Sequence, residues 1–511
     1  MSTKGIVSSA HTLISSSGLK VFNQGGNAMD AAIAMALTSG VVLPDMCGFG
    51  ADAFLLYYDA KSKKITAING SSFAPKKGSI EYMKSLGYSK VPDEGIYSIT
   101  LPGAVDTYFT ALHEFGSMPF SVLAKDAISL ARDGVPASEK VVRHMHTDLD
   151  KMRRFNALSK QYLKDDQPYQ TGDLLINEDY AKAIEYVCEH GREGFYKGKI
   201  AKDIEETTKG YITVEDLSRV HCEILDPICV NYRDYIIYNT PPISQGILHL
   251  EEMNILDQFD ISKYPVNSAK SIHLMAEIKK IAFYDRNTYF GDPAFVDNPT
   301  HKVLSKQYAK ECASKIKMDT CLEENIELGI HHTTSFVAVD KWGNAVSMIH
   351  SIAATWGSGI MVDGFLLNNR GCQFSFDPHH PNALQPYKKT MHTLNTYIIT
   401  DQNGNLRYVG NTPGGDYQPQ WNMQNIVNVI DYKMDVQSAL EHAKWTEHNN
   451  MIRIESQCGK DTIEQLKKMG HMVEIHEPYT LSGASQLIEV RGKLKLGGCD
   501  PRCDGAAMPE I

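Results

Sequence analysis

The sequence predicts a layered protein of the α/β or α+β class, with helices packed on mostly antiparallel sheets. Segments with helical spacing of apolar residues dominate the first two thirds of the chain, and hairpin-like pairs of β-branched segments follow from Thr333. The 511 residues contain no internal repeat and no Pro/Ser-rich linker. We therefore expect one continuous domain despite the length.

Helices are expected where apolar residues recur every three to four positions. The first is Ala-rich and predicted to be buried, with Gly25 and Gly26 just ahead of it and Gly40 after it. The expected helices span 27–37, 121–132, 180–187, 268–284, 422–430 and 436–443.

Strands are expected in pairs, because β-branched and aromatic runs flank short turn sequences such as Trp342-Gly343-Asn344. The expected hairpins pair 53–58 with 64–68, 334–339 with 345–352, 396–400 with 406–409, and 487–490 with 493–496.

The composition argues against several classes of partner. Lys and Arg number 51 against 61 Asp and Glu, and no basic stretch stands out, so neither nucleic acid nor an anionic membrane is an expected partner. The first twenty residues lack the pattern of a secretory signal, and the apolar window 28–43 contains Asp30 and is too short to span a bilayer. We expect a cytoplasmic protein with mostly free thiols and a small-molecule substrate.

Common catalytic motifs are missing from the sequence. No GxSxG, P-loop or HExxH pattern occurs, and the Gly48-Phe49-Gly50 segment precedes a predicted strand instead of the helix that a dinucleotide site needs. Cys499 and Cys503 are close in sequence, but a structural zinc ion needs four ligands. The sequence predicts no metal and no organic cofactor.

Thr333 is the remaining candidate for catalytic chemistry. Its hydroxyl stands at the start of a predicted hairpin, and its simplest interpretation is that threonine favours strands. A hydroxyl nucleophile needs a base, and one solution is the free α-amine of an N-terminal threonine, produced by cleavage of the preceding peptide bond. The periodicity of the sequence does not point to that cleavage.

A resemblance to the γ-glutamyltransferase family covers nearly the whole chain. Gln24-Gly25-Gly26-Asn27 resembles the family's opening, and the stretch from Thr333 to Val346 resembles its processing site. Further matching segments occur in the family's order at 40–50, 356–360, 366–369, 413–415 and 500–502.

The resemblance implies a fold, a processing event and catalytic residues. Members are N-terminal nucleophile hydrolases, four-layer αββα sandwiches that cut themselves. The cut would fall between His332 and Thr333, leaving a large chain 1–332 and a small chain 333–511 that stay together as a heterodimer. Thr333 would be the nucleophile, Ser351 would support it, and the Gly414 and Gly415 N–H groups would stabilise the oxyanion. A homo-oligomer of this heterodimer is possible, and the sequence does not decide its size.

The substrate pocket departs from the family's pattern. The positions that hold a γ-glutamyl group carry other residues here, namely Ser71, Ala353, Arg370, Gln373, His392 and Thr393. Gln373 in place of an acidic residue removes the attraction for an ammonium, and Arg370 offers a bidentate carboxylate binder. We therefore expect Arg370, Gln373, His392 and Thr393 to bind a small carboxylate-bearing amide.

The pattern is similar to the branch of the family that includes oxamate amidohydrolase. A structural ion pair is an equally simple role for Arg370. A γ-glutamyl hydrolase or transferase with a rebuilt pocket stays an alternative, and so does an uncleaved ligand-binding protein.

Overall fold

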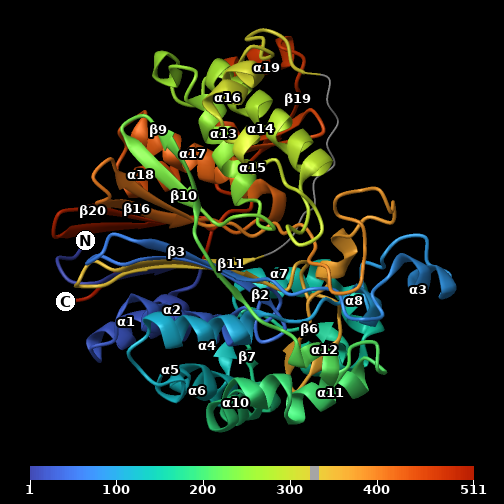
Figure 1. The fold of residues 1–511 in the computed structure, drawn as a ribbon. Helices are drawn as coiled ribbons and strands as arrows, with labels where there is room; N and C mark the ends of the chain where they lie inside the picture. Colours follow the sequence, from blue (N-terminus) through green and yellow to red (C-terminus); the bar gives the residue numbers. More distant parts are fainter. Residues whose placement is uncertain (323–332) are drawn as a thin grey trace.

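Two stacked antiparallel sheets form the centre of the computed structural model, and helices cover both outer faces (Figure 1). The structure describes residues 1–322 and 333–511. All neighbouring strands within the two large sheets run antiparallel. This is the four-layer αββα sandwich, and the predicted fold class is confirmed.

The strands of the two sheets come from distant parts of the chain. The first sheet has the order β22 (Ala506–Pro509), β1 (Ile6–Ser9), β11 (Thr334–Val339), β12 (Ala345–Ser351), β2 (Asp52–Tyr58), β3 (Ile65–Gly70) and β8 (Glu223–Leu225). The second has the order β21 (Leu494–Cys499), β20 (Gln486–Arg491), β16 (Leu406–Asn411), β15 (Tyr397–Asp401), β10 (Tyr235–Asn239) and β9 (Ile228–Tyr232). The four expected hairpins are present, with ends shifted by a few residues.

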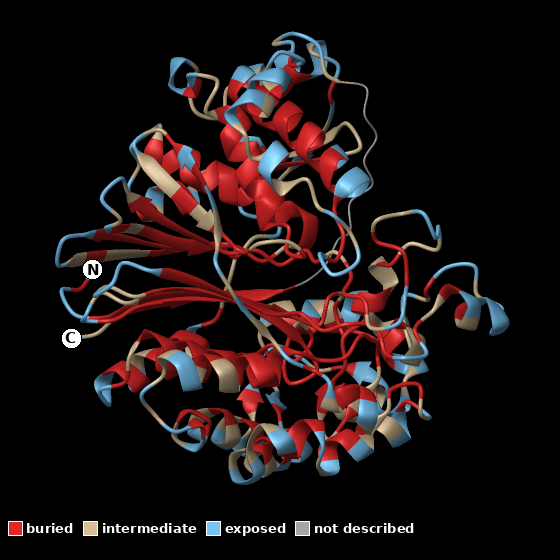
Figure 2. Ribbon diagram, viewed as in Figure 1, coloured by how far each residue is buried: buried red, intermediate tan, exposed pale blue. Residues whose placement is uncertain are grey.

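Apolar side chains fill the space between the two sheets. Leu56, Val337 and Val339 of the first sheet belong to one buried cluster with Ile398 and Ile488 of the second. Figure 2 shows the sheets as almost wholly buried, whereas exposed residues lie on the outer faces of the helices. Burial of a side chain of this size contributes roughly 1.5–3 kcal/mol, so this cluster holds the sheets together.

The helix α2 (Ala28–Val42) lies beneath the first sheet, and each of its residues is buried. Asn27 caps it, accepting the Met29 and Asp30 N–H groups while the Asp30 carboxylate accepts the Asn27 N–H. The predicted helix is confirmed, but its predicted end at residue 37 is wrong. Gly40 lies inside the helix and does not end it. The glycine is needed there for close packing, because a Cβ would stand 2.6 Å from Tyr180 Oη.

Other helices complete the two outer layers. The layer with α2 includes α1 (Thr12–Asn23), α4 (Ala104–Phe115), α5 (Phe120–Leu123), α6 (Lys125–Asp133) and α10 (Glu178–Tyr196). The opposite layer includes α13 (Gly246–Leu256), α14 (Ala269–Tyr289), α16 (Lys306–Ala313), α17 (Gln418–Ile430), α18 (Val436–Glu441) and α19 (Lys460–Lys468). The helix expected at 121–132 is divided into α5 and α6 at Ala124. Among the described helices, none has the length and apolar character needed to cross a bilayer.

Candidate active site

Thr333 lies at one end of the central strands of the first sheet. It directly precedes β11, where Thr334 pairs with His350 of β12. The next residue of β12, Ser351, pairs with Asp52 at the start of β2. Thr333, Ser351 and Asp52 therefore lie side by side at the same end of three consecutive strands, and neighbouring strands are about 4.8 Å apart.

The Thr333 side chain lines a large cavity. Thr333 is 2% exposed, and its Oγ1 has no hydrogen-bond partner in the described ranges. The cavity measures about 780 Å³. Thr334 and Ser335 also have unpartnered hydroxyls, but of the three only Thr333 is among the described residues lining the cavity. Buried hydroxyls usually have partners, so an unpartnered one on a cavity wall marks a candidate reactive group.

The loop after β16 brings Gly414 to the same cavity. Gly414 has φ 128° and Gly415 has φ 57°, both in the region that favours glycine. A Cβ on Gly414 would lie 2.5 Å from Cζ3 of Trp421, so the loop also needs glycine for space. Neither amide N–H donates to an acceptor within the described residues. The structure thus brings together Thr333 and Gly414, two of the residues predicted to be catalytic.

Ser351 is buried at the end of β12, next to this site. Its Oγ accepts the Ala353 N–H at 2.8 Å, and it makes a further interaction as well. His332, on the other side of the predicted cleavage point, lies outside the described residues, so its placement stays a prediction.

The loop of Gly414 and Gly415 is held from behind by three buried side chains that the sequence did not single out. Arg286 of α14 pairs with Asp416 through both ends of its guanidinium, the Nη2–Oδ2 distance being 3.3 Å. Gln245 donates to the Gly415 carbonyl at 2.9 Å and accepts from Arg286 at 3.3 Å. Asp416 directly follows the glycine pair, which is a sequence clue; nothing local marks Arg286 or Gln245.

The four predicted substrate-binding residues form one cluster. Nη1 of Arg370 donates to Thr393 Oγ1 at 3.1 Å and to Gln373 Oε1 at 3.4 Å. Asp52 links the rest: its Oδ2 lies 3.9 Å from Arg370 Nε and 3.0 Å from His392 Nε2. Nη2 of Arg370 has no hydrogen-bond partner in the described part of the chain. Nε also has no hydrogen-bond partner there, because 3.9 Å is too long for one, so the cluster contains a loose ion pair and two guanidinium nitrogens that are free to donate.

Burial controls the charges in this cluster. It raises the pKa of Asp52 to about 7, an effect that the Arg370 charge opposes. It lowers the pKa of Arg370 below its usual value, and it lowers that of His392 far enough to keep the imidazole neutral. Arg370 is thus the fixed positive charge of the cluster, and Asp52 changes charge near neutral pH.

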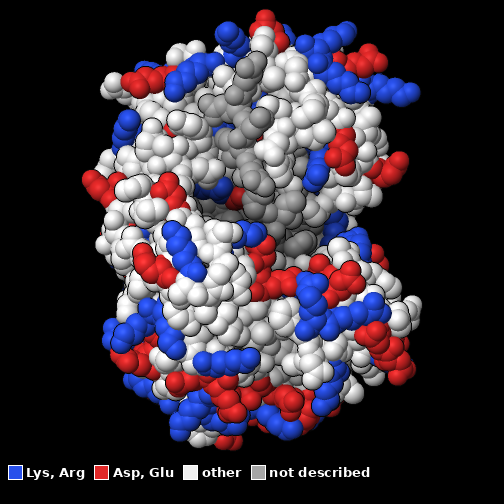
Figure 3. All heavy atoms as spheres, turned by 90° about the vertical axis from the view of Figure 1, so that its right-hand side faces the viewer, with Lys and Arg blue, Asp and Glu red and all other residues white. Residues whose placement is uncertain are grey.

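The cluster is not part of the described cavity lining. Asp52 stands two strands from Thr333, whereas the residues that line the cavity include Ala10 and the segments 479–484 and 501–504. Its walls mix aromatic and basic side chains, among them Tyr417, Trp421, Arg453 and Lys140. On the face in Figure 3, acidic and basic side chains are interspersed, with no broad patch of one sign.

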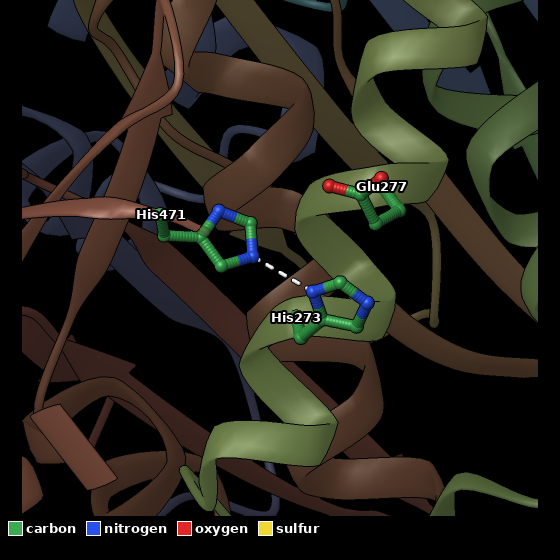
Figure 4. A group of neighbouring side chains, drawn as sticks. All are labelled: His273, Glu277 and His471. Carbon is green, nitrogen blue, oxygen red and sulfur yellow. Dashed lines mark hydrogen bonds between the residues drawn. The ribbon is translucent and has the colours of Figure 1, made fainter. Parts of the chain in front are cut away.

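A separate buried group has the composition of a metal site. It consists of His273 and Glu277 on α14 and of His471, which point toward one another (Figure 4). The two imidazoles share a hydrogen bond of 2.7 Å between Nδ1 of His273 and Nε2 of His471, and Lys280 pairs with Glu277 at 2.8 Å. A lysine charge on the carboxylate disfavours a cation, so this group fits a hydrogen-bonded cluster better than a metal site.

Comparison with known proteins places the chain in a family. A family model described as Gamma-glutamyltranspeptidase matches residues 15–510. The chain belongs to the γ-glutamyltranspeptidase family. It is 33% identical over 522 residues to the glutathione hydrolase-like YwrD proenzyme of Bacillus subtilis (strain 168), covering 99% of this chain and 98% of that one.

Two further relatives of this γ-glutamyltranspeptidase-family chain differ in their named activities. The oxamate amidohydrolase proenzyme of Klebsiella pneumoniae is 27% identical over 526 residues, covering 99% of this chain and 98% of that one. The crystal structure of cephalosporin acylase from Bacillus halodurans superimposes with a TM-score of 0.94 at 29% identity, covering 99% and 96%. The chain is therefore an enzyme of the γ-glutamyltranspeptidase family.

Proposed function

We propose that the chain is a precursor that cleaves itself before Thr333, and that the new N-terminal threonine hydrolyses the amide bond of a carboxylate-bearing substrate. The observation that carries this proposal is the unpartnered Thr333 Oγ1 on a cavity wall that it shares with Gly414. The relatives in Bacillus subtilis and Klebsiella pneumoniae are named as proenzymes, which supports processing of this chain as well.

The freed amine supplies the base. An α-amine titrates near neutral pH, so it can take the proton of Thr333 Oγ1 as the oxygen attacks the amide carbonyl. The Gly414 and Gly415 N–H groups would then donate to the developing oxyanion, and the protonated amine would return the proton to the leaving nitrogen. Water, activated by the same amine, would hydrolyse the resulting ester. The nucleophile, the base and the oxyanion donors in this scheme all come from the chain itself.

The Arg370 cluster lies two strands from Thr333 and outside the described cavity lining, but its unpartnered guanidinium nitrogens support a carboxylate on the substrate. The guanidinium is fully buried, yet its Nη2 has no hydrogen-bond partner in the described ranges. Unsatisfied buried donors of a charged group cost free energy, and a carboxylate oxygen would satisfy this one. An oxamate-like acid, which has a carboxylate beside its amide and no ammonium, fits this chemistry.

A second candidate is a γ-glutamyl amide such as glutathione, and the cavity size favours it. Sites of 300–1,000 Å³ commonly hold drug-sized ligands, and about 780 Å³ greatly exceeds what an oxamate-sized molecule would fill. A larger amide would place its leaving group along the aromatic wall.

One assay separates the candidates. Purified protein is incubated with oxamate or with glutathione, and ammonia and glutamate are measured; Thr333→Ala controls for contaminating activity. The oxamate-like proposal predicts ammonia release from oxamate, with a raised KM in Arg370→Lys, which keeps the charge but loses the planar fork. Turnover of glutathione alone would reject the carboxylate argument. Intact, uncleaved protein active on neither would support a binding protein.

A further inference from the structure

Two neighbouring cysteines lie at the cavity that Thr333 lines, and one of them, Cys503, belongs to its lining. Cys499 ends β21, and Cys503 follows after Asp500, Pro501 and Arg502. The two Sγ atoms lie 3.5 Å apart. Both residues are free thiols.

Buried ion pairs fix the turn between the two thiols. Asp500 pairs with Lys444 and, at 3.0 Å, with Nη1 of Arg502. Arg502 also donates through Nε to Glu455 at 2.8 Å. Because the intervening residues are held on both sides, the two sulfurs stay near each other without being bonded.

The two thiols differ in access and in charge environment. Cys503 is half-buried and lines the cavity, whereas Cys499 is 8% exposed and is not among the described lining residues. Lys140 also lines the cavity and donates to the Arg502 carbonyl, which places a positive charge beside Cys503. The hydrogen bond between the two thiols and the Lys140 charge favour a lowered pKa for Cys503, and the same bond raises the pKa of Cys499. This asymmetry suits an attacking thiolate and a resolving thiol.

We propose that Cys503 and Cys499 form a reversible disulfide in the wall of the substrate cavity when the protein meets a peroxide. The Cys503 thiolate attacks one peroxide oxygen, the O–O bond breaks, and Cys503 becomes a sulfenic acid with release of hydroxide. The Cys499 sulfur then attacks the Cys503 sulfur, the S–O bond breaks, and water leaves. Two thiols are oxidised, and one peroxide is reduced to two waters.

The bond would reshape the cavity wall. A disulfide closes the sulfurs from 3.5 Å to about 2.05 Å. Since ion pairs hold Asp500 and Arg502, the shift falls on Cys503 and the following Asp504, which both line the cavity. We expect weaker substrate binding in the oxidised form. This consequence rests on the proposed function, whereas bond formation does not.

The chemical test uses the full-length protein. Wild type, Cys499→Ser, Cys503→Ser and the control Cys458→Ser are treated with hydrogen peroxide, and the remaining thiols are alkylated for mass spectrometry. Cys458 is another partly buried thiol and is not part of the described cavity lining. We expect wild type and Cys458→Ser to lose two alkylatable thiols, with a linked 499/503 peptide that dithiothreitol separates. An unlinked pair in peroxide-treated wild type, or the same thiol loss in Cys499→Ser, would overturn the proposal.

The functional test follows on the same samples. With the substrate that the protein turns over, the KM of oxidised wild type should rise several-fold and return after reduction, while that of Cys503→Ser, which lacks the attacking thiol, should not change with peroxide. A disulfide that forms without changing KM would overturn its proposed effect on substrate binding, whereas the proposed disulfide formation would stand. Absence of any turnover would count against the proposed function alone, since the thiol mapping stands without it.

Discussion

Thr333 and Gly414 belong to the lining of one cavity, and neither the Thr333 Oγ1 nor the Gly414 N–H has a hydrogen-bond partner in the described ranges. A reacting carbonyl between them would meet a nucleophile and a donor at once. A backbone donor held in this glycine loop would need little reorganisation during the reaction.

Replacing Gly414 with alanine tests this donor. The added Cβ would lie 2.5 Å from the Trp421 ring, and a φ of 128° is unfavourable for alanine, so the loop must shift. We expect kcat to fall by about 10²–10³, the usual effect of losing an oxyanion donor. Gly459→Ala is the matched control, since it also has positive φ but no atom within 4 Å of an added Cβ. Equal kcat values for the two variants would contradict the assignment.

Asp52 makes folding stability depend on pH. Burial raises its pKa in the folded state to about 7 from an ordinary value of 3.8, so the folded protein holds this proton more tightly than the unfolded chain. The contribution of Asp52 to the free energy of unfolding is therefore most favourable below about pH 4, and it is lost as the pH rises through about 7. Relative to Asp52→Asn, the wild type should lose on the order of a few kcal/mol between pH 4 and pH 8.

Urea unfolding of both proteins across this range measures the effect. A difference between the wild type and Asp52→Asn that does not change with pH would show that Asp52 titrates normally. In that case Arg370 would face a permanent carboxylate, and its role as a binder of substrate carboxylates would weaken.

At the level of elements, helix α14 holds the loop that contains Gly414 and Gly415, the predicted oxyanion donors, through the pair of Arg286 and Asp416. Arg286→Met leaves the Asp416 charge without this partner, and we expect kcat to fall about 10²-fold with little change in KM, because a displacement of about 1 Å at a reacting group has this effect. Arg233→Met is the matched control, since Arg233 pairs with Asp431 and Asp257 on another part of the fold. A kcat that falls equally in both variants would indicate general destabilisation.

Local patterns predicted most elements, and tertiary contacts explain what they missed. The end of α2 was placed too early because Gly40 serves contact with Tyr180, which no local pattern contains. Thr333, Ser351 and the glycine loop followed from matching motifs. Asp52 did not, because its bond to His392 joins residues 340 positions apart and its sequence resembles an ordinary strand start. Arg286 likewise has the pattern of an ordinary helical residue.

At the level of the whole molecule, both sheets mix strands from the two sides of residue 333. In the first sheet β11 and β12 lie between β1 and β2, and in the second β15 lies beside β10. Cleavage before Thr333 would leave each product paired along several strands with the other. The two products should therefore elute together from a gel-filtration column in native buffer and separate only in denaturant. Separation without denaturant would contradict this arrangement.

Self-cleavage is tested most directly by the intact mass of the purified, active protein under denaturing conditions, with N-terminal sequencing of each chain. Self-cleavage before Thr333 should give two chains for the wild type, the smaller beginning Thr-Thr-Ser-Phe, and one inactive chain of 56.9 kDa for Thr333→Ala. An active wild-type preparation consisting of a single 56.9 kDa species would contradict it.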